Sequence, residues 1–455
     1  MSGNAKEMTS GSPTKLILGF AVPLLFGYLF QQFYSLVDSM IVGQVLGKDA
    51  LAAVGSTGAV NFLIVGFCMG LCSGFAIPVA QRFGAREYSM MRRFVANCVW
   101  LSVAFSVVFT VIVCVLCRNI LIWMQTPENI MEGAYEYIFI IFAGIPTAIL
   151  YNLMSGILRS MGESKVPLVF LIISSVINIV LDLLFLIVFK TGVKGAAIAT
   201  VIAQFISGVA CVIYSVKKYE LLHIKKEEWK LNPNICMILC SMGVPMGLQY
   251  SITAIGSVIL QTSVNTLGSD AVAAITAANK VAFFMCCPYD ALGATMATYG
   301  GQNVGAKKLE RLWPGLLSAS LLGFAYCLLA LAMAFTVGGP LAGLFLGQDG
   351  AYLVPDARMF LIITVAFHPT LVLVNVVRFM IQGMGFPNFA ILAGVMEMIA
   401  RVLVGIWIVP PFGFYGAAFA SPLAWVLADA FLVPAFFHCR KKLFKLLGES
   451  KATIS

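Results

Sequence analysis

Long apolar segments recur along the whole chain of 455 residues, and they constrain its fold more than any other feature. As helices, segments such as Leu16 to Val42 and Leu316 to Val337 are long enough to cross a hydrocarbon core of about 30 Å. Only 11% of the residues are charged and 60% are hydrophobic, so a charged, water-facing surface is excluded. We expect an all-α membrane protein of twelve transmembrane helices. Their predicted limits are 16–42, 51–80, 94–117, 134–157, 166–189, 194–216, 235–262, 271–298, 312–337, 353–380, 388–409 and 414–438.

The polarity pattern argues against a transmembrane barrel, which would need short segments of alternating polarity. The first thirteen residues, MSGNAKEMTSGSP, are polar and lack the charged-then-apolar layout of a cleaved signal. The first span should therefore remain in the mature protein.

Positive charges are distributed unequally between alternate connecting segments. If the amino terminus is inside, most of the 29 Lys and Arg residues fall on cytoplasmic segments, including residues 82–93 and 217–230. This positive-inside bias predicts that both termini are cytoplasmic in a multi-pass protein of the plasma (inner) membrane. The net charge of +9 then reflects orientation in the lipid bilayer, and we expect no nucleic-acid partner.

The chain repeats itself with an almost constant offset of 221 to 223 residues. Because four motifs return in the same order, we expect two parallel repeats of six helices, with a cavity between them and a rocking motion. The predicted parts are a tail (1–15), an N-lobe (16–216), a cytoplasmic linker (217–234), a C-lobe (235–438) and a second tail (439–455). The four pairs are LGKDALAAV (46–54) with LGSDAVAAI (267–275), QRFGA (81–85) with QNVGA (302–306), PTAILYNLMSGILRSMG (146–162) with PTLVLVNVVRFMIQGMG (369–385), and KGAAIAT (194–200) with YGAAFAS (415–421).

Two carboxylates of the first repeat have no counterpart in the second. In INIVLDLLFLIVF (177–189), Asn178 and Asp182 are one helical turn apart, and they fall on Arg401 and Gly405 of the second repeat. Asp38, in QQFYSLVDSMIVG, falls on Ile259 or Leu260. A charge at membrane depth costs about 2.5–3.5 kcal/mol and normally faces a bundle interior or a wet cavity.

Asp38 and Asp182 could bind a small cation or exchange a proton. With Asn178, Thr200 and Asn152 they would supply hard oxygen ligands for Na⁺, whereas two neighbouring carboxyl groups alone could share a proton. The alternative is that they only make polar contacts between helices. Seven further polar residues could line a cavity or bond neighbouring helices: Gln31, Gln32, Tyr34, Asn152, Gln204, Gln249 and Asn375.

The second repeat carries its own charges. Glu397 and Arg401 lie four apart in VMEMIARVLVG, a spacing that favours a structural ion pair. Lys280 could pair with Asp290 or with Asp429, and the roles of these three residues and of Arg378 stay open. Pro23 in the first span and Pro245 in the seventh predict matching helix bends.

Motifs for catalysis or for nucleotide binding are missing from the sequence. It contains no GxxxxGK[ST], HExxH or GxSxG pattern, and its twelve Cys and three His show no metal-ligand spacing. We therefore expect no enzyme and no cofactor, apart from Na⁺ if the acidic site binds it. We also expect a monomer.

Several motifs resemble those of the multidrug and toxic compound extrusion (MATE) transporters. They are VDSMIVGQVLGKDALAAVG, PVAQRFGAR, LRSMGESKVP and GGQNVGAKK, and the likeness covers roughly residues 15 to 440. The resemblance implies a V-shaped pair of helical bundles and an antiporter that exports organic cations and other amphipathic compounds in exchange for H⁺ or Na⁺. It also implies a coupling site in the amino lobe, at Asp38, Asn178, Asp182 and Thr200, and a bend at Pro23.

One departure from the family pattern narrows this expectation. Gln249 and Asn375 occupy positions where branches resembling the sodium-driven type have acids, so we expect coupling in the amino lobe. Two alternatives remain within the same superfamily, a lipid-linked sugar flippase and a metabolite exporter. A membrane receptor without a transport cycle is a third.

Overall fold

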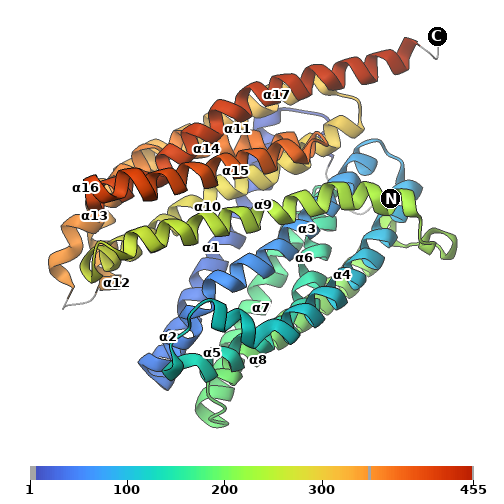
Figure 1. Ribbon diagram of the computed structural model, residues 1–455. Helices are drawn as coiled ribbons and strands as arrows, with labels where there is room; N and C mark the ends of the chain where they lie inside the picture. The colour runs from blue at the N-terminus through green and yellow to red at the C-terminus, as the bar shows by residue number, and fades with distance from the viewer. Residues whose placement is uncertain (1–6, 347–349, 453–455) are drawn as a thin grey trace. The chain divides into compact units, whose positions relative to one another are not determined.

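The computed structural model describes residues 7–346 and 350–452, and its regular elements are all helices (Figure 1). The long helices of the first half are α1 (Pro13–Leu46), α2 (Lys48–Ser56), α3 (Gly58–Gly84), α4 (Tyr88–Trp123), α5 (Glu128–Ala143), α6 (Ile145–Ser160), α7 (Lys165–Leu183) and α8 (Val193–Lys218). Those of the second half are α9 (Pro233–Asn265), α10 (Ser269–Gly305), α11 (Leu312–Thr336), α12 (Gly338–Leu346), α13 (Val354–Ala366), α14 (His368–Gly383), α15 (Pro387–Leu403), α16 (Val409–Ala418) and α17 (Ala420–Ala452).

The predicted all-helical membrane fold is confirmed. Ten helical segments of the described chain are long and apolar enough to cross a membrane, and two bent pairs raise the number to as many as twelve. The pairs are α5 with α6, bent by 46°, and α13 with α14, bent by 49°. Each bend precedes a proline, Pro146 or Pro369, at the start of the second helix. Proline cannot donate a backbone hydrogen bond within a helix but is tolerated in its first turn.

The contacts divide the chain into two compact units. Unit 1 contains residues 26–251 and unit 2 contains residues 8–25 together with those from 252 onward. Two long helices are therefore shared, because α1 begins in unit 2 and ends in unit 1 while α9 does the reverse. The repeat boundaries expected from the sequence, 16–216 and 235–438, describe the duplicated segments and stay a prediction.

The segment before α1 is bonded to the QNVGAKK motif of unit 2. Met8 donates its backbone N–H to Oε1 of Gln302 at 2.7 Å, and its carbonyl accepts from Asn303 at 3.2 Å. Lys308 donates to the Thr9 carbonyl at 2.8 Å and Arg311 to the Gly11 carbonyl at 2.9 Å. The repeated motif thus fixes the start of α1 on unit 2.

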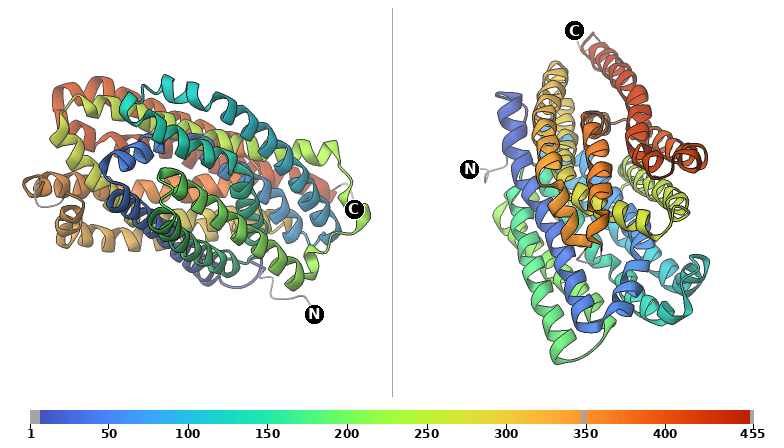
Figure 2. Two further views of the ribbon diagram at one scale, coloured as in Figure 1. Left: turned by 90° about the horizontal axis from the view of Figure 1, so that it is seen from below. Right: turned by 90° about the vertical axis from the view of Figure 1, so that its left-hand side faces the viewer.

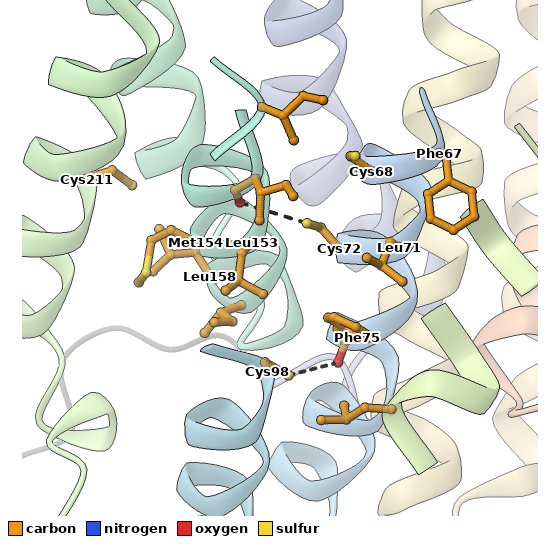
Figure 3. Packing of buried hydrophobic residues seen from close by; sticks show 14 of the residues in the cluster. Phe67, Cys68, Leu71, Cys72, Phe75, Cys98, Leu153, Met154, Leu158 and Cys211 are labelled. Atoms are coloured by element: carbon orange, nitrogen blue, oxygen red, sulfur yellow. Dashed lines mark hydrogen bonds between the residues drawn. The ribbon is translucent and has the colours of Figure 1, made fainter. Parts of the chain in front are cut away.

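Unit 1 is packed around α3 and α6, with α7 against α8 and α6 also against α4 and α8 (Figures 1 and 2). In Figure 3, Leu153, Met154 and Leu158 of α6 lie between Cys211 of α8 and the Cys72 face of α3. The twelve cysteines are free thiols, and many of them are buried in apolar packing, where cysteine behaves as a small hydrophobe.

Glycines bring α3 into backbone contact with the first part of α9. A Cβ at Gly70 would lie 2.5 Å from the Met246 carbonyl oxygen, and one at Gly74 would lie 2.5 Å from Cα of Gly243. Gly70 and Gly74 are four residues apart, as are Gly243 and Gly247, so this is small-residue packing of the kind used between transmembrane helices.

The backbone repeats unusual conformations at equivalent positions of the two halves. Gly47 and Gly268, in the LGKDA and LGSDA motifs, have φ of 88° and 94°, and Arg86 and Lys307 have φ of 60° and 57°. A five-residue π-helical segment follows α7 (η1, Leu184–Val188), and another follows α15 (η6, Val404–Ile408). The duplication seen in the sequence therefore extends to local backbone geometry.

Candidate ion-coupling site

Asp38 of α1 and Asp182 of α7 lie side by side in unit 1. Their carboxyl groups are within hydrogen-bonding range of each other, and Asp182 is fully buried. Oδ1 of each is buried without a hydrogen-bond partner among the described residues. Two buried acids in this arrangement are stabilised when they bind a proton or a cation, because it reduces their mutual repulsion.

Asn178 and Thr200 complete the group of four predicted residues. The amide orientation of Asn178 that satisfies its neighbours donates Nδ2 to Oδ2 of Asp182 at 3.2 Å. Its oxygen then accepts from the backbone N–H of Thr200 at 3.2 Å and from the Thr200 hydroxyl at 3.3 Å. Asn178 therefore connects the acidic residue of α7 to α8.

Local helix geometry fixes these side chains. Asn178 and Asp182 are one turn apart on the buried face of α7, and the π-helical η1 begins two residues after Asp182. Single π-helical turns are frequent at functional sites, because the wider turn frees backbone groups and rotates the side chains that follow. The second repeat has a π turn too, so this feature belongs to the shared scaffold and the acids do not.

Two tyrosines adjoin the carboxylates. Tyr34 of α1 and Tyr137 of α5 are close enough to Asp38 and Asp182 to interact with them electrostatically. Tyr137 is buried in a small apolar cluster with Val42 and Leu186. Tyr34 is among the residues that the sequence predicts for a polar cavity, whereas Tyr137 is not. At the offset of 223 residues Tyr137 falls on Phe360, so the comparison that singled out the acids would have found it.

The group can bind a small cation through oxygen atoms. Two carboxylates, one amide and one hydroxyl are hard ligands of the type that Na⁺ prefers, and the unpartnered Oδ1 atoms supply free lone pairs. The described residues contain no cluster of three His, Cys, Asp or Glu that could hold a metal ion. A monovalent ion or a proton therefore fits this site better than a transition metal.

The other predicted cavity residues are dispersed. Asn152 donates to the carbonyl of Ala148 one turn earlier at 2.8 Å, so its amide is engaged with its own helix. Gln249 is buried in unit 1, whereas Asn375 of unit 2 donates to Asp290 at 3.5 Å. Half-buried positions on α1 and α8 are occupied by Gln31, Gln32 and Gln204. Pro23 lies inside the uninterrupted α1, two residues before the helix passes from unit 2 to unit 1.

In unit 2 the charges form a separate buried group. Glu397 accepts hydrogen bonds from Arg378 and from Arg401, the latter at 3.3 Å, and all three side chains are at most 9% exposed. Asp429 lies near Arg378, and both of its carboxylate oxygens are buried without a hydrogen-bond partner among the described residues. Lys280 lies over the ring of Phe345, 5.4 Å from its centroid.

Comparison with known proteins identifies the family. The MatE family model matches residues 23–184 and, a second time, residues 245–407. The chain belongs to the MatE family. The two matches start 222 residues apart, within the range of offsets found in the sequence repeat. The family predicted from the motifs is confirmed, and this MatE chain has the apolar helices of a multi-pass membrane protein.

Relatives of this MatE chain are named for multidrug resistance or for transport. The Probable multidrug resistance protein YoeA of Bacillus subtilis (strain 168) is 33% identical over 300 residues, which are 64% of this chain and 65% of YoeA. The FAD transporter of Shewanella oneidensis is 23% identical over 342 residues, or 73% of this chain and 74% of that protein. The matched region thus spans just under two thirds of YoeA.

Solved structures share the fold. The outward-facing conformation of a multidrug resistance MATE family transporter of the MOP superfamily superposes with a TM-score of 0.91 at 22% identity, covering 98% of this chain and 100% of that one. At this identity the comparison establishes the fold alone.

Proposed function

We propose that this MatE transporter is a secondary active antiporter. It exports organic cations and other amphipathic drugs or toxins in exchange for H⁺ or Na⁺, by alternating access between two lobes. Coupling occurs in the amino lobe, at Asp38, Asn178, Asp182 and Thr200. The observation that carries this proposal is the adjacency of two buried carboxyl groups, each with one oxygen that has no hydrogen-bond partner among the described residues.

Their physical chemistry supports a coupling role. Two adjacent carboxylates repel each other and are poorly solvated when buried, so one bound cation stabilises the pair strongly. Binding of H⁺ or Na⁺ would draw α1 and α7 together, and its release would separate them. Because α1 is shared between the units, a change at Asp38 is transmitted along a helix that begins in the other unit.

The test is transport by the purified full chain in proteoliposomes. We expect uptake of a fluorescent organic cation when an outward or inward gradient of H⁺ or Na⁺ is imposed, and a series of pH and sodium concentrations identifies the ion. Asp38→Asn and Asp182→Asn should each reduce gradient-driven uptake at least about tenfold, since one charge of the pair is lost. The matched control is Asp49→Asn, an exposed acid of α2 in the same unit.

Undiminished gradient-driven uptake in both variants would contradict the coupling assignment while leaving transport itself intact. Absence of any gradient-driven flux in the unchanged protein, with saturable binding of the drug, would instead favour a receptor.

We also propose that both termini are cytoplasmic in the plasma (inner) membrane and that one chain is the working unit. The positive-inside bias supports the orientation, and the four coupling residues all belong to one chain. Cysteine labelling of a residue added to either tail in intact cells tests the first point, and light scattering in detergent tests the second.

A metabolite exporter is the second candidate, because one relative is named an FAD transporter. A flippase for pyrophosphate-linked lipids is less favoured, since Arg378 and Arg401 are both engaged by Glu397. Counterflow of a labelled flavin nucleotide against the organic cation, in the same vesicles, separates these functions.

A further inference from the structure

Unit 1 contains an apolar cavity of about 750 Å³ that is separate from the acidic site. Its walls are α4 and α8, its floor is α6, and the linker segment 222–229 covers one end. The floor is buried, with Leu153 at 6% and Ile157 at 2% exposure, whereas the rim residues Val103 and Phe205 are both 52% exposed. The cavity is therefore a groove that opens sideways, toward the lipid surrounding these helices.

The length of the groove matches one leaflet of a bilayer. Along α4 it extends from Val95 to Ser106 and along α6 from Pro146 to Ile157. Eleven residues of helix measure roughly 16 Å, which is about half of a hydrocarbon core of about 30 Å. The lining begins at the linker segment 222–229 and ends at Pro146, next to the bend between α5 and α6. An acyl chain of the leaflet nearest the linker fits this span.

One polar group in the groove has no hydrogen-bond partner in the described part of the chain. Ser102 is 4% exposed, and its hydroxyl makes no hydrogen bond with the described residues. The hydroxyl of Ser106, one turn farther along, is satisfied by the Val103 carbonyl at 2.9 Å. Ser102 lies in the middle of the groove, between Val95 and Ser106 on α4, where an acyl chain would run.

The covered end of the groove is rich in positive charge. Lys217 follows the lining residue Val216, and Lys225 and Lys226 follow Ile224, all three with exposed side chains. Of the acids in this segment, Glu228 is neutralised by Arg92, which leaves Glu220 and Glu227 against the exposed lysines. Exposed cations beside a membrane attract anionic lipid headgroups by about 1 kcal/mol each.

We propose that this groove binds an anionic phospholipid, with one acyl chain between α4 and α8 and the headgroup against Lys225 and Lys226. The apolar floor and the length of one leaflet match the acyl chain, and the adjacent lysines match the anionic headgroup. The occupant differs from the transported compound, and the site shares no residue with the acidic pair.

Trp229 permits a direct test, because it lines the covered end and is 40% exposed. The full chain is placed in phosphatidylcholine nanodiscs that contain a small fraction of either acyl-brominated phosphatidylglycerol or acyl-brominated phosphatidylcholine. Bromine quenches tryptophan on contact, and the difference between the unchanged protein and Trp229→Phe isolates the signal of this residue. We expect quenching by the anionic lipid to exceed that by the zwitterionic lipid several-fold at equal fraction.

The variants divide the site into its parts. The double change Lys225→Gln and Lys226→Gln should remove the preference for the anionic lipid without filling the groove. Ser102→Phe should abolish quenching by filling it, whereas Val111→Phe, on the exposed face of α4 outside the groove, should leave quenching unchanged.

Equal quenching by the two lipids would mean that Trp229 contacts only ordinary surrounding lipid, and it would overturn the proposal. So would a preference for the anionic lipid that survives the lysine changes, or displacement of the lipid by a transported cation, which would mark a substrate site. These measurements need no ion gradient, so failure of the antiport proposal leaves them interpretable.

Discussion

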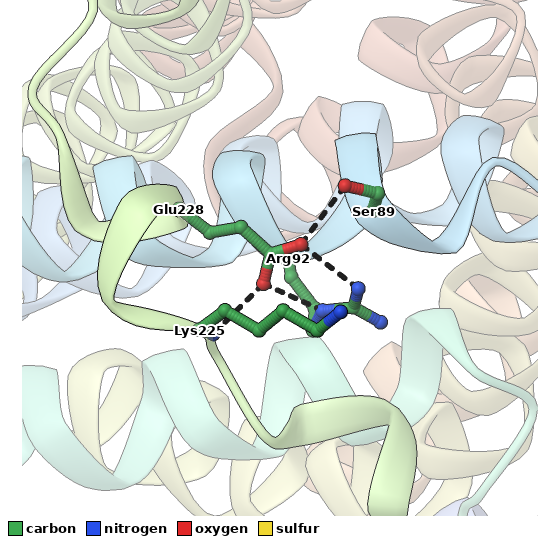
Figure 4. Close-up of polar contacts among 4 residues, drawn as sticks. All are labelled: Ser89, Arg92, Lys225 and Glu228. Carbon is green, nitrogen blue, oxygen red and sulfur yellow. Dashed lines mark hydrogen bonds and ion pairs between the residues drawn. The ribbon is translucent and has the colours of Figure 1, made fainter.

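Glu228 and Arg92 form a two-pronged ion pair that fastens the linker to the start of α4 (Figure 4). Nε and Nη2 of Arg92 donate to the two carboxylate oxygens at 2.7 and 2.8 Å, and Ser89 and the backbone N–H of Lys225 each donate at 2.9 Å. Four donors around one buried carboxylate explain why the linker adopts a fixed path despite its many charges.

The hydrogen bonds from Arg92 lower the pKa of Glu228 from 4.5 to about 2. An acid whose pKa is lower in the folded state than in the unfolded state stabilises the fold at pH values above its unfolded-state pKa. This contribution is lost as the pH falls toward the folded-state pKa. Glu228→Gln should therefore reduce the free energy of unfolding by about 3 kcal/mol at pH 7. The deficit should shrink by roughly half at pH 3. Thermal unfolding in detergent at both pH values measures it.

Glu227→Gln is the matched control for this experiment, because Glu227 is the exposed neighbour. A deficit for Glu228→Gln that is the same at pH 7 and pH 3 would mean that the ionised pair does not stabilise the linker.

Tyr137 should strengthen ion binding without being required for folding. Tyr137→Phe keeps the ring in its apolar cluster and removes only the hydroxyl near Asp38 and Asp182. Loss of one polar interaction costs about 1 kcal/mol, so we expect the apparent affinity for the coupling ion to fall roughly fivefold. Transport rates over a series of ion concentrations measure this. Tyr135→Phe, whose ring packs on Phe139, serves as the control and should leave the affinity unchanged.

The membrane fold could be predicted because lipid permits few structures and apolar segments are easily recognised. A comparison of the two halves singled out Asp38 and Asp182, since neither acid has a counterpart, and the family resemblance grouped them into one site. Tyr137 escaped because a tyrosine in an apolar span looks like packing unless it is compared with Phe360. In the linker, Glu228 looked like one of many solvated charges.

No local feature of the sequence predicts that α1 and α9 are each shared between the two units. Both helices read as ordinary apolar spans with one internal proline each, and which neighbours they contact depends on tertiary packing. The bends near Pro146 and Pro369 did leave a signal, because each proline follows the end of one helix by a few residues.

Close contact between α3 and α9 should make Gly74 intolerant of any side chain. A Cβ there would lie 2.5 Å from Cα of Gly243 and 2.6 Å from the Met242 carbonyl oxygen, and backbone atoms cannot rotate away. We expect Gly74→Ala to lower the free energy of unfolding by about 1–3 kcal/mol. Gly55→Ala in α2, where a Cβ meets nothing within 4 Å, should be neutral or stabilising. Equal melting temperatures for the two variants would refute the close approach.

Glu397 should act as a structural anion in unit 2 and not as a coupling residue. It faces both Arg378 and Arg401 at 4% side-chain exposure, so Glu397→Gln would leave two guanidinium groups buried without their carboxylate. Removal of one member from such a group typically costs about 3–5 kcal/mol. We therefore expect a large loss of thermal stability in detergent, whereas the exposed Glu310→Gln should change little.

Glu397→Gln protein that survives purification should keep the ion dependence of transport, because the acidic pair of unit 1 is untouched. A variant as stable as the unchanged protein but without ion coupling would move the coupling site to unit 2.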